Sequence, residues 1–138
     1  MAVINEKFSV NTEGHFDIID ITKKVENCLN CHPTKDATVI VSVAGSTASI
    51  TTIEYEPGLL KDLPNALNKI APEGAEYFHD ETWHDGNGNA HVLASIMGSS
   101  ITIPVIDGIL FLGTWQQIVL IDFDNKSRQR TICVQILQ

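Results

Sequence analysis

Hydrophobic and polar residues alternate in short runs along most of this chain, a spacing that is typical of half-buried β-strands. The segments 37–44 (ATVIVSVA) and 128–137 (RQRTICVQIL) are also rich in the β-branched residues that favour strands. The same reasoning predicts shorter strands at 3–10, 15–19, 48–55, 75–79, 100–106, 109–113 and 116–123. Between two of these, the Asp-Gly pair at 107–108 predicts a tight hairpin.

Short turn-like segments separate other predicted strands as well, so strands that follow each other in sequence are expected to pair. Two further antiparallel pairs are expected: 37–44 with 48–55, and 116–123 with 128–137. The sequence DNKS forms the predicted turn of the second pair.

Two segments carry apolar residues at helical rather than alternating spacing. One helix is predicted over roughly 21–32 and a second over 57–70, where Pro64 should kink or divide it. A third segment, 91–98, has the length for one or two turns of helix. The overall expectation is a single α+β domain, 1–138, with two helices on a mainly antiparallel β-sheet or sandwich.

The composition is that of a globular protein, with 43% hydrophobic and 19% charged residues. The formal net charge of −8 provides no electrostatic footprint for nucleic acid and would repel anionic lipid. The first ten residues lack the pattern of a signal peptide, and no apolar run approaches the 18 or so residues that span a bilayer. We therefore expect a cytoplasmic protein with neither nucleic acid nor membrane as a partner.

The stretch WHDGNGNAH (83–91) does not fit a plain pattern of core and turn. With His79 just upstream, it places three of the five histidines within thirteen positions. Neutral imidazole is a good ligand for zinc and related ions, so His79, His84 and His91 are predicted to bind a divalent metal. The alternative is that these are exposed or merely hydrogen-bonded loop histidines.

Their irregular spacing excludes a single helix face, so the chain must fold back to bring the histidines together. Gly86 and Gly88 would permit that bend. Asp85 can bind the metal directly or orient a histidine ligand. The remaining histidines, His15 and His32, are interpreted as structural.

Other polar residues suggest substrate contacts. The small residues at Gly98, Ser99 and Ser100 leave N–H groups and hydroxyls free to hold an anion, or they simply end a helix and begin a strand. Arg130, with Arg128, is the strongest anion partner near the end of the chain, unless its strand presents a plain charged face.

Three residues elsewhere have both functional and structural interpretations. Trp115 offers a wall for a flat ring, although most tryptophans serve in a core. Gln116 can hydrogen-bond the edge of a heterocycle or lie on a sheet. Glu54 can assist proton transfer or metal binding, or be an exposed strand carboxylate.

Three quoted stretches carry a resemblance to a known family: GSTASITTIEYEPGLLKDL (45–63), APEGAEYFHDETWHDGNGNAHVLASIMGSSITIPVIDGILFLGTWQQIVLIDFDN (71–125) and the closing RQRT strand. The chain resembles the YjbQ family of secondary thiamine-phosphate synthases, and looks most like its archaeal members. The resemblance implies a compact, mainly β domain that forms a homotrimer, with a polar cleft beside the histidines that often holds a metal. The implied activity joins hydroxymethylpyrimidine pyrophosphate to thiazole phosphate.

The resemblance carries over position by position. The matching residues are His79, His91, Glu54, Ser99, Ser100, Thr114, Trp115 and Gln116. Three positions depart from the family: Gly45 and Asn89 replace histidines of bacterial and archaeal members respectively, and Leu93 replaces a basic residue. The first two leave the third metal ligand open, with His84 as the candidate, and the third weakens the case for phosphate binding.

Two functions are compatible with these residues. In the first, a divalent ion (zinc or magnesium) on His79 and His91 neutralises a pyrophosphate leaving group, with Glu54, Asp85 and His91 as catalytic groups. Ser99, Ser100 and Arg130 would hold the phosphorylated metabolite, and Thr114–Gln116 would form the opposite wall of the cleft, within the chain or across a subunit boundary. In the second, a trimer binds a metal or a metabolite without turnover.

Overall fold

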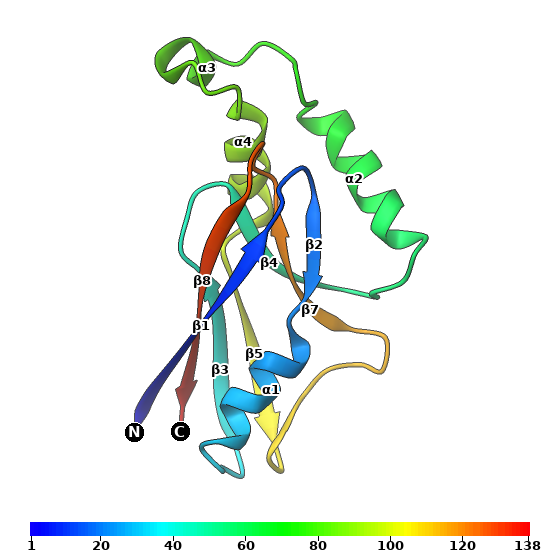
Figure 1. The fold of residues 1–138 in the computed structure, drawn as a ribbon. Coiled ribbons are helices and arrows are strands. Elements are labelled where there is room, and N and C mark those ends of the chain that lie inside the picture. The colour runs from blue at the N-terminus through cyan, green and yellow to red at the C-terminus, as the bar shows by residue number, and fades with distance from the viewer.

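Eight strands and four helices make up the chain, and the structure, a computed structural model, describes all residues 1–138 (Figure 1). The strands are β1 (Val3–Thr12), β2 (Asp17–Asp20), β3 (Ala37–Val43), β4 (Ala48–Ile53), β5 (Ser100–Ile106), β6 (Ile109–Leu110), β7 (Gln117–Asp122) and β8 (Arg128–Leu137). The helices are α1 (Thr22–Asn30), α2 (Leu59–Ile70), α3 (Phe78–Trp83) and α4 (Gly88–Met97).

The strands form two antiparallel sheets, one of five strands in the order β1-β8-β3-β5-β6 and one of three in the order β2-β7-β4. One core lies between the sheets and under α1, and includes Val25, Val39, Ile50, Leu120 and Ile132. A second core covers the other face of the three-stranded sheet, where α2 and α4 pack with Leu67, Leu93, Val119 and Ile121. The predicted single α+β domain is confirmed as a layered arrangement.

This layering explains why two strands have different sequence patterns. β7 has an unbroken apolar run, Ile118 to Ile121, because both of its faces are covered. β8 alternates, with Ile132, Val134 and Ile136 facing the core. Because alternate residues of a strand share a face, Arg130 points the same way as these three and is itself buried.

The helix count differs from the prediction, since the structure has four helices rather than two. The strand expected at 75–79 is instead the approach to α3 and its first residues. The one or two turns expected at 91–98 are part of α4, which begins earlier, at Gly88. Both helices are short, so neither displays enough periodicity to be assigned with certainty from a single sequence. The proline in α2 does not divide that helix, which runs through Pro64.

The hairpin predicted at Asp107–Gly108 is confirmed. β5 pairs with β6, and both turn residues have positive φ, as a two-residue turn of this kind requires. The two other predicted pairings are wrong, because the chain crosses to the opposite sheet each time. β3 pairs with β5 and β8, and β7 pairs with β2 and β4.

The two chain ends lie side by side at one end of the molecule, and α3 lies at the other (Figure 1). Residues Ala2 and Gln138 exchange two backbone hydrogen bonds there. None of the four helices has the length and apolar character needed to cross a membrane.

Candidate functional site

Two glycines allow α3 and α4 to fold back on each other. Gly86 has φ +70°, a left-handed conformation that β-branched side chains resist. Gly88 begins α4 without room for a side chain, because a Cβ there would lie 2.5 Å from Cβ of Tyr77. The bend and the close approach together bring His79, on α3, beside His91, on α4.

The imidazole rings of His79 and His91 form the centre of the candidate metal site. Their centroids are 4.1 Å apart, and their planes are inclined by 39°. Nδ1 of His79 lies 3.5 Å from Oδ1 of Asp80 and 3.5 Å from Oδ1 of Asp85. One ligand atom from each of these three residues lies within 4.8 Å of the others, close enough for one ion to contact all three.

The donor set itself indicates which ions fit. Imidazole nitrogen suits zinc and other transition metals, whereas magnesium prefers oxygen ligands and retains several waters. Two imidazoles with two carboxylates therefore favour a transition metal over magnesium. Asp80 also accepts the backbone N–H of Gly88 at 2.9 Å, which fixes its carboxylate at the start of α4.

The protonation state of His91 is the one that metal binding requires. Burial lowers the pKa of His91 and the adjacent His79 lowers it further, while the carboxylates of Asp85, Asp124 and Asp80 act in the opposite direction. The net result is a pKa below its ordinary value, so His91 is neutral at neutral pH. Neutral imidazole is the form that binds metal ions.

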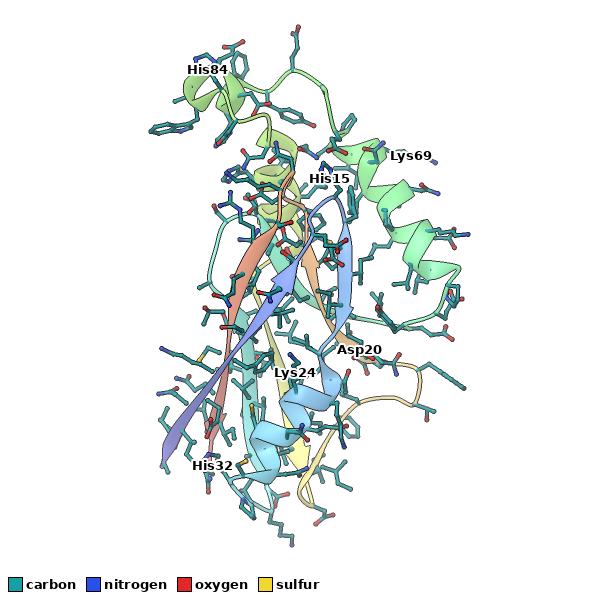
Figure 2. All side chains as sticks on the ribbon, viewed as in Figure 1. His15, Asp20, Lys24, His32, Lys69 and His84 are labelled. Atoms are coloured by element: carbon teal, nitrogen blue, oxygen red, sulfur yellow. The ribbon has the colours of Figure 1, made fainter.

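His84 lies close in sequence but outside this group of ligand atoms. It ends α3 in a left-handed conformation with φ 57° and lines a cavity of about 440 Å³ together with Tyr77, Asp80 and Glu81. Figure 2 shows His84 at the α3 end of the molecule. His84 as the third ligand therefore stays a prediction, and the structure offers Asp80 and Asp85 as nearer partners of His79.

A buried ion-pair network lies beneath the histidines, at the ends of β7 and β8. The guanidinium of Arg130 binds both carboxylate oxygens of Asp122, at 2.7 Å and 2.8 Å, and donates to Thr47 at 2.7 Å. Asp124 accepts hydrogen bonds from Thr47 at 2.9 Å and from Arg128 at 3.0 Å. The buried Arg130 and the half-buried Arg128 balance the charges of the two aspartates, which makes the burial of both carboxylates tolerable.

The network connects to the histidine loop. The amide of Asn87 lies between the carboxylates of Asp85 and Asp124. Asn125 donates from Nδ2 to the backbone carbonyl of Asp85 at 2.7 Å. The segment that carries Asp85 is therefore held by the end of β7.

Sequence reasoning did not identify Asp80, Asp122 or Asp124 as site residues. A signal was present for two of them, because Asp122 and Asp124 interrupt the apolar strand QQIVLIDF and the turn that follows it. Arg130 was identified as an anion partner or a surface charge. It is buried, and two of its three side-chain nitrogens, Nε and Nη2, donate to partners within the chain.

Ser99 lines a small cavity next to this network. The cavity, called here the serine pocket, has a volume of about 240 Å³ and is lined chiefly by Gly45, Ser46, Ser95, Gly98 and Ser99. Ser100 begins β5 opposite Ser42 and is exposed.

The remaining predicted residues lie at the other end of the three-stranded sheet. Glu54, Thr114 and Trp115 line a separate cavity of about 280 Å³, and Trp115 is 73% exposed rather than part of a core. Gln116 donates to Thr52 at 3.1 Å.

The strand register shows how far this second group lies from the histidines. β4 and β7 pair Ala48 with Asp122 at one end and Ile53 with Gln117 at the other. Five residues of strand separate these ends by about 17 Å. A single chain therefore does not bring Thr114–Gln116 to the histidine cluster, and only the version of that hypothesis with a subunit boundary remains.

The two histidines interpreted as structural each contact a glutamate. Nδ1 of His15 lies 2.6 Å from Glu73, and Nε2 of His32 lies 2.6 Å from Glu6. Figure 2 shows His32 at the opposite end of the molecule from His84. Neither belongs to the group of adjacent ligand atoms formed by His79, Asp80 and Asp85.

Comparison with known proteins gives one consistent family. The model of the family described as "UPF0047 protein YjbQ-like" matches residues 6–138. A UPF0047 protein of Archaeoglobus fulgidus is 36% identical over 126 residues, which cover 91% of this chain and 96% of the relative. A second, from Methanocaldococcus jannaschii, is 33% identical over 132 residues, covering 95% of this chain and 92% of the relative.

Solved structures agree with this. A crystal structure described as a YbjQ-like protein of unknown function from Sulfolobus solfataricus has a TM-score of 0.92 and 32% identity, covering 99% of this chain and 97% of that one. A YjbQ/UPF0047 protein from Clostridium acetobutylicum has a TM-score of 0.86 and 34% identity, covering 96% of this chain and 99% of that one. The chain therefore belongs to the YjbQ-like UPF0047 family.

Proposed function

We propose that this protein binds a divalent transition metal between α3 and α4 and uses it to act on a small phosphorylated metabolite. The specific reaction proposed is that of a secondary thiamine-phosphate synthase, which joins hydroxymethylpyrimidine pyrophosphate to thiazole phosphate. The observation that carries the proposal is the 4.1 Å approach of His79 to His91 beside two carboxylates. Such a cluster offers the nitrogen and oxygen ligands that a transition metal binds.

The reaction needs charge neutralisation more than covalent chemistry. The bond between the pyrimidine methylene carbon and the pyrophosphate oxygen breaks, and the thiazole nitrogen forms a new bond to that carbon. A bound divalent ion would supply the positive charge that stabilises the departing pyrophosphate. His79, His91, Asp80 and Asp85 would hold that ion.

The other residues of the proposal would orient the metal ligands, bind the phosphate group or assist proton transfer. Asp85 is held by Asn125 at 2.7 Å through its backbone, which supports a fixed orientation toward His79. Ser99, Ser100 and Arg130 are proposed to bind a phosphate group. Glu54 is proposed to assist proton transfer only if a neighbouring subunit brings it to the cluster, because in one chain it lies at the far end of β4.

The activity is tested with purified protein, zinc, manganese or magnesium, and both substrates. Pyrophosphate release and thiamine phosphate formation are expected to require both substrates together. The His91→Ala variant should lose this activity, while His32→Ala, at the opposite end of the molecule, should retain it. Pyrophosphate release that is the same with and without thiazole phosphate would contradict the synthase reaction.

The second candidate function is metal or metabolite binding without turnover, and one observation favours it. Leu93 lies at the position where the family was expected to carry a basic residue, and it is fully buried in the core beneath α4. That position therefore contributes no charge to a phosphate. Metal and metabolite binding with no product formed would support this alternative over the synthase.

A homotrimer is proposed as the assembled form. Large apolar side chains are exposed around β5, β6 and the segment that follows, namely Ile106, Ile109, Phe111 and Trp115. β6 pairs with only the last two residues of β5, which leaves most of that edge of β5 unpaired. Exposed apolar residues and open strand edges are features of surfaces that other chains cover.

Light scattering tests the assembly. The expected mass is three times the chain mass of 15.2 kDa at micromolar concentration. A charge introduced into the exposed apolar surface by Phe111→Glu should shift the mass toward that of one chain. A wild-type protein that is already monomeric would contradict the proposal.

A further inference from the structure

We propose that the serine pocket is a binding site for the phosphate monoester of a small metabolite, and that Gly45 opens this site by leaving one nitrogen of Arg130 uncovered. The site would bind phosphate without any metal. The inference rests on the proposed function only for which metabolite carries the ester, since the anion chemistry follows from this pocket alone.

Arg130 has one guanidinium nitrogen that the buried network does not use. Its Nε and Nη2 atoms donate to Asp122 and Thr47, whereas Nη1 donates to nothing in the chain. The side chain is only 8% exposed. Every fully buried side-chain nitrogen and oxygen has a hydrogen-bond partner. Because Nη1 has none, it is not fully buried and must reach space that solvent or a ligand can enter.

Gly45 marks where that space lies. A Cβ at this position would be 2.9 Å from Nη1 of Arg130, closer than side-chain atoms can approach. Gly45 also lines the serine pocket. Arg130 is not itself a lining residue of the pocket, so Gly45 lies between the pocket and Nη1. We infer that the missing side chain lets an anion in the pocket approach the two N–H groups of Nη1.

Other donors surround the same space. The backbone N–H groups of Gly45, Ser46 and Ser99 make no backbone hydrogen bond within the chain. The Ser95 hydroxyl donates to the His91 carbonyl at 2.8 Å, but the hydroxyls of Ser46 and Ser99 are not used in this way. Successive free N–H groups with adjacent hydroxyls are the ordinary means by which a loop holds phosphate.

The surrounding charges permit an anion. Asp122 and Asp124 face Arg130, and Arg128 pairs with Asp124, so these four charges cancel. The carbonyls at the end of α4 carry a partial charge of about −0.5 near Gly98, so they disfavour an anion at that end of the pocket. The phosphate is therefore expected on the Gly45 side of the pocket, against Nη1.

The position of the pocket links it to the histidine cluster. Ala94, on the pocket wall, follows His91 by three residues on α4, which is about 4.5 Å along the helix axis. A phosphorylated acceptor held in the serine pocket would thus present the rest of its structure toward a group bound at the histidines. In the proposed synthase reaction this acceptor is the thiazole phosphate.

The test uses inorganic phosphate and full-length protein treated with a chelator, followed by amide NMR. Saturable shifts are expected at the N–H groups of Gly45, Ser46 and Ser99. Ser99→Asp and Ser46→Asp each place a negative charge in the pocket and should weaken binding at least tenfold. Ser9→Asp, the same change on the exposed face of β1, should leave affinity within about twofold.

Two further variants sharpen the result. Gly45→Ala should also weaken phosphate binding, because its Cβ would obstruct Nη1, and the two serine variants remain decisive if this one does not fold. His91→Ala should retain phosphate binding while losing metal, which separates this inference from the proposed function. Shifts spread over the surface without saturation, or Ser99→Asp binding phosphate as tightly as Ser9→Asp, would overturn it.

Discussion

Replacing Asp122 with alanine is expected to lower the free energy of unfolding by about 3–5 kcal/mol. Asp122 is fully buried, and the Arg130 side chain that binds it through two hydrogen bonds is 8% exposed. Without the carboxylate, the guanidinium remains buried with most of its charge unpaired. Chemical denaturation gives the free energy, and the melting temperature should fall by roughly 10–20 °C.

Two controls test whether the unpaired charge of Arg130 causes this loss of stability. Glu26→Ala removes an exposed carboxylate that pairs with Lys23 at 3.7 Å, and it should cost no more than about 0.5 kcal/mol. The double variant Asp122→Leu with Arg130→Met removes both charges and should recover much of the loss. If Asp122→Ala proved as stable as Glu26→Ala, the Asp122–Arg130 pair would not be important for folding.

Acid should weaken the same network. Burial alone would raise the pKa of Asp122, but hydrogen bonds from Arg130 and Thr12 outweigh it and hold the pKa below its ordinary value of 3.8. A carboxyl whose pKa is lower in the folded state stabilises the fold above its unfolded pKa. This contribution is lost as pH falls below about 4 toward the folded pKa, and the loss should be smaller in Asp122→Ala.

Metal affinity is expected to fall by at least about 10–100-fold in both His79→Ala and His91→Ala. Losing a residue that only orients a metal ligand already lowers affinity by that much. Each substitution removes one ring of the pair with centroids 4.1 Å apart. Zinc titration of the apo-protein measures the change. His15→Ala is the matched control, because the His15 ring contacts Glu73 at 2.6 Å and not a residue of the cluster.

Two other variants test the geometry rather than the ligands alone. His84→Ala should retain most of the affinity, since His84 neither belongs to the group His79, Asp80 and Asp85 nor packs its ring against His79 as His91 does. Gly86→Val should reduce affinity, because valine resists the left-handed conformation that turns α4 back toward α3. Equal zinc binding by the His79, His91 and His15 variants would refute the metal site.

Local chemistry alone was sufficient for several features. The Asp107–Gly108 turn was predictable because the conformation that it requires is set by two adjacent residues. Most strands were predictable because alternation records which face is buried. The histidine cluster was predictable in outline, since His79 and His91 lie in one segment with glycines between them.

Strand partners were not predictable, because alternation indicates that a face is buried without identifying the sheet that covers it. β3 and β7 both cross to the opposite sheet from the strand that follows each of them. α3 was missed because its six residues contain no buried position and so no apolar stripe. In both cases the missing information lies in contacts between distant parts of the chain.

The sequence by itself determined the fold class, the family and the segment that gathers metal-type ligands, because these follow from local patterns. Only the tertiary structure decided which groups share a site. It buried Arg130 against Asp122 and against Thr47, which is 83 residues away in sequence, and left its third nitrogen next to Gly45. It also separated Trp115 from the histidines, because an antiparallel strand carries its two ends to opposite edges of the sheet.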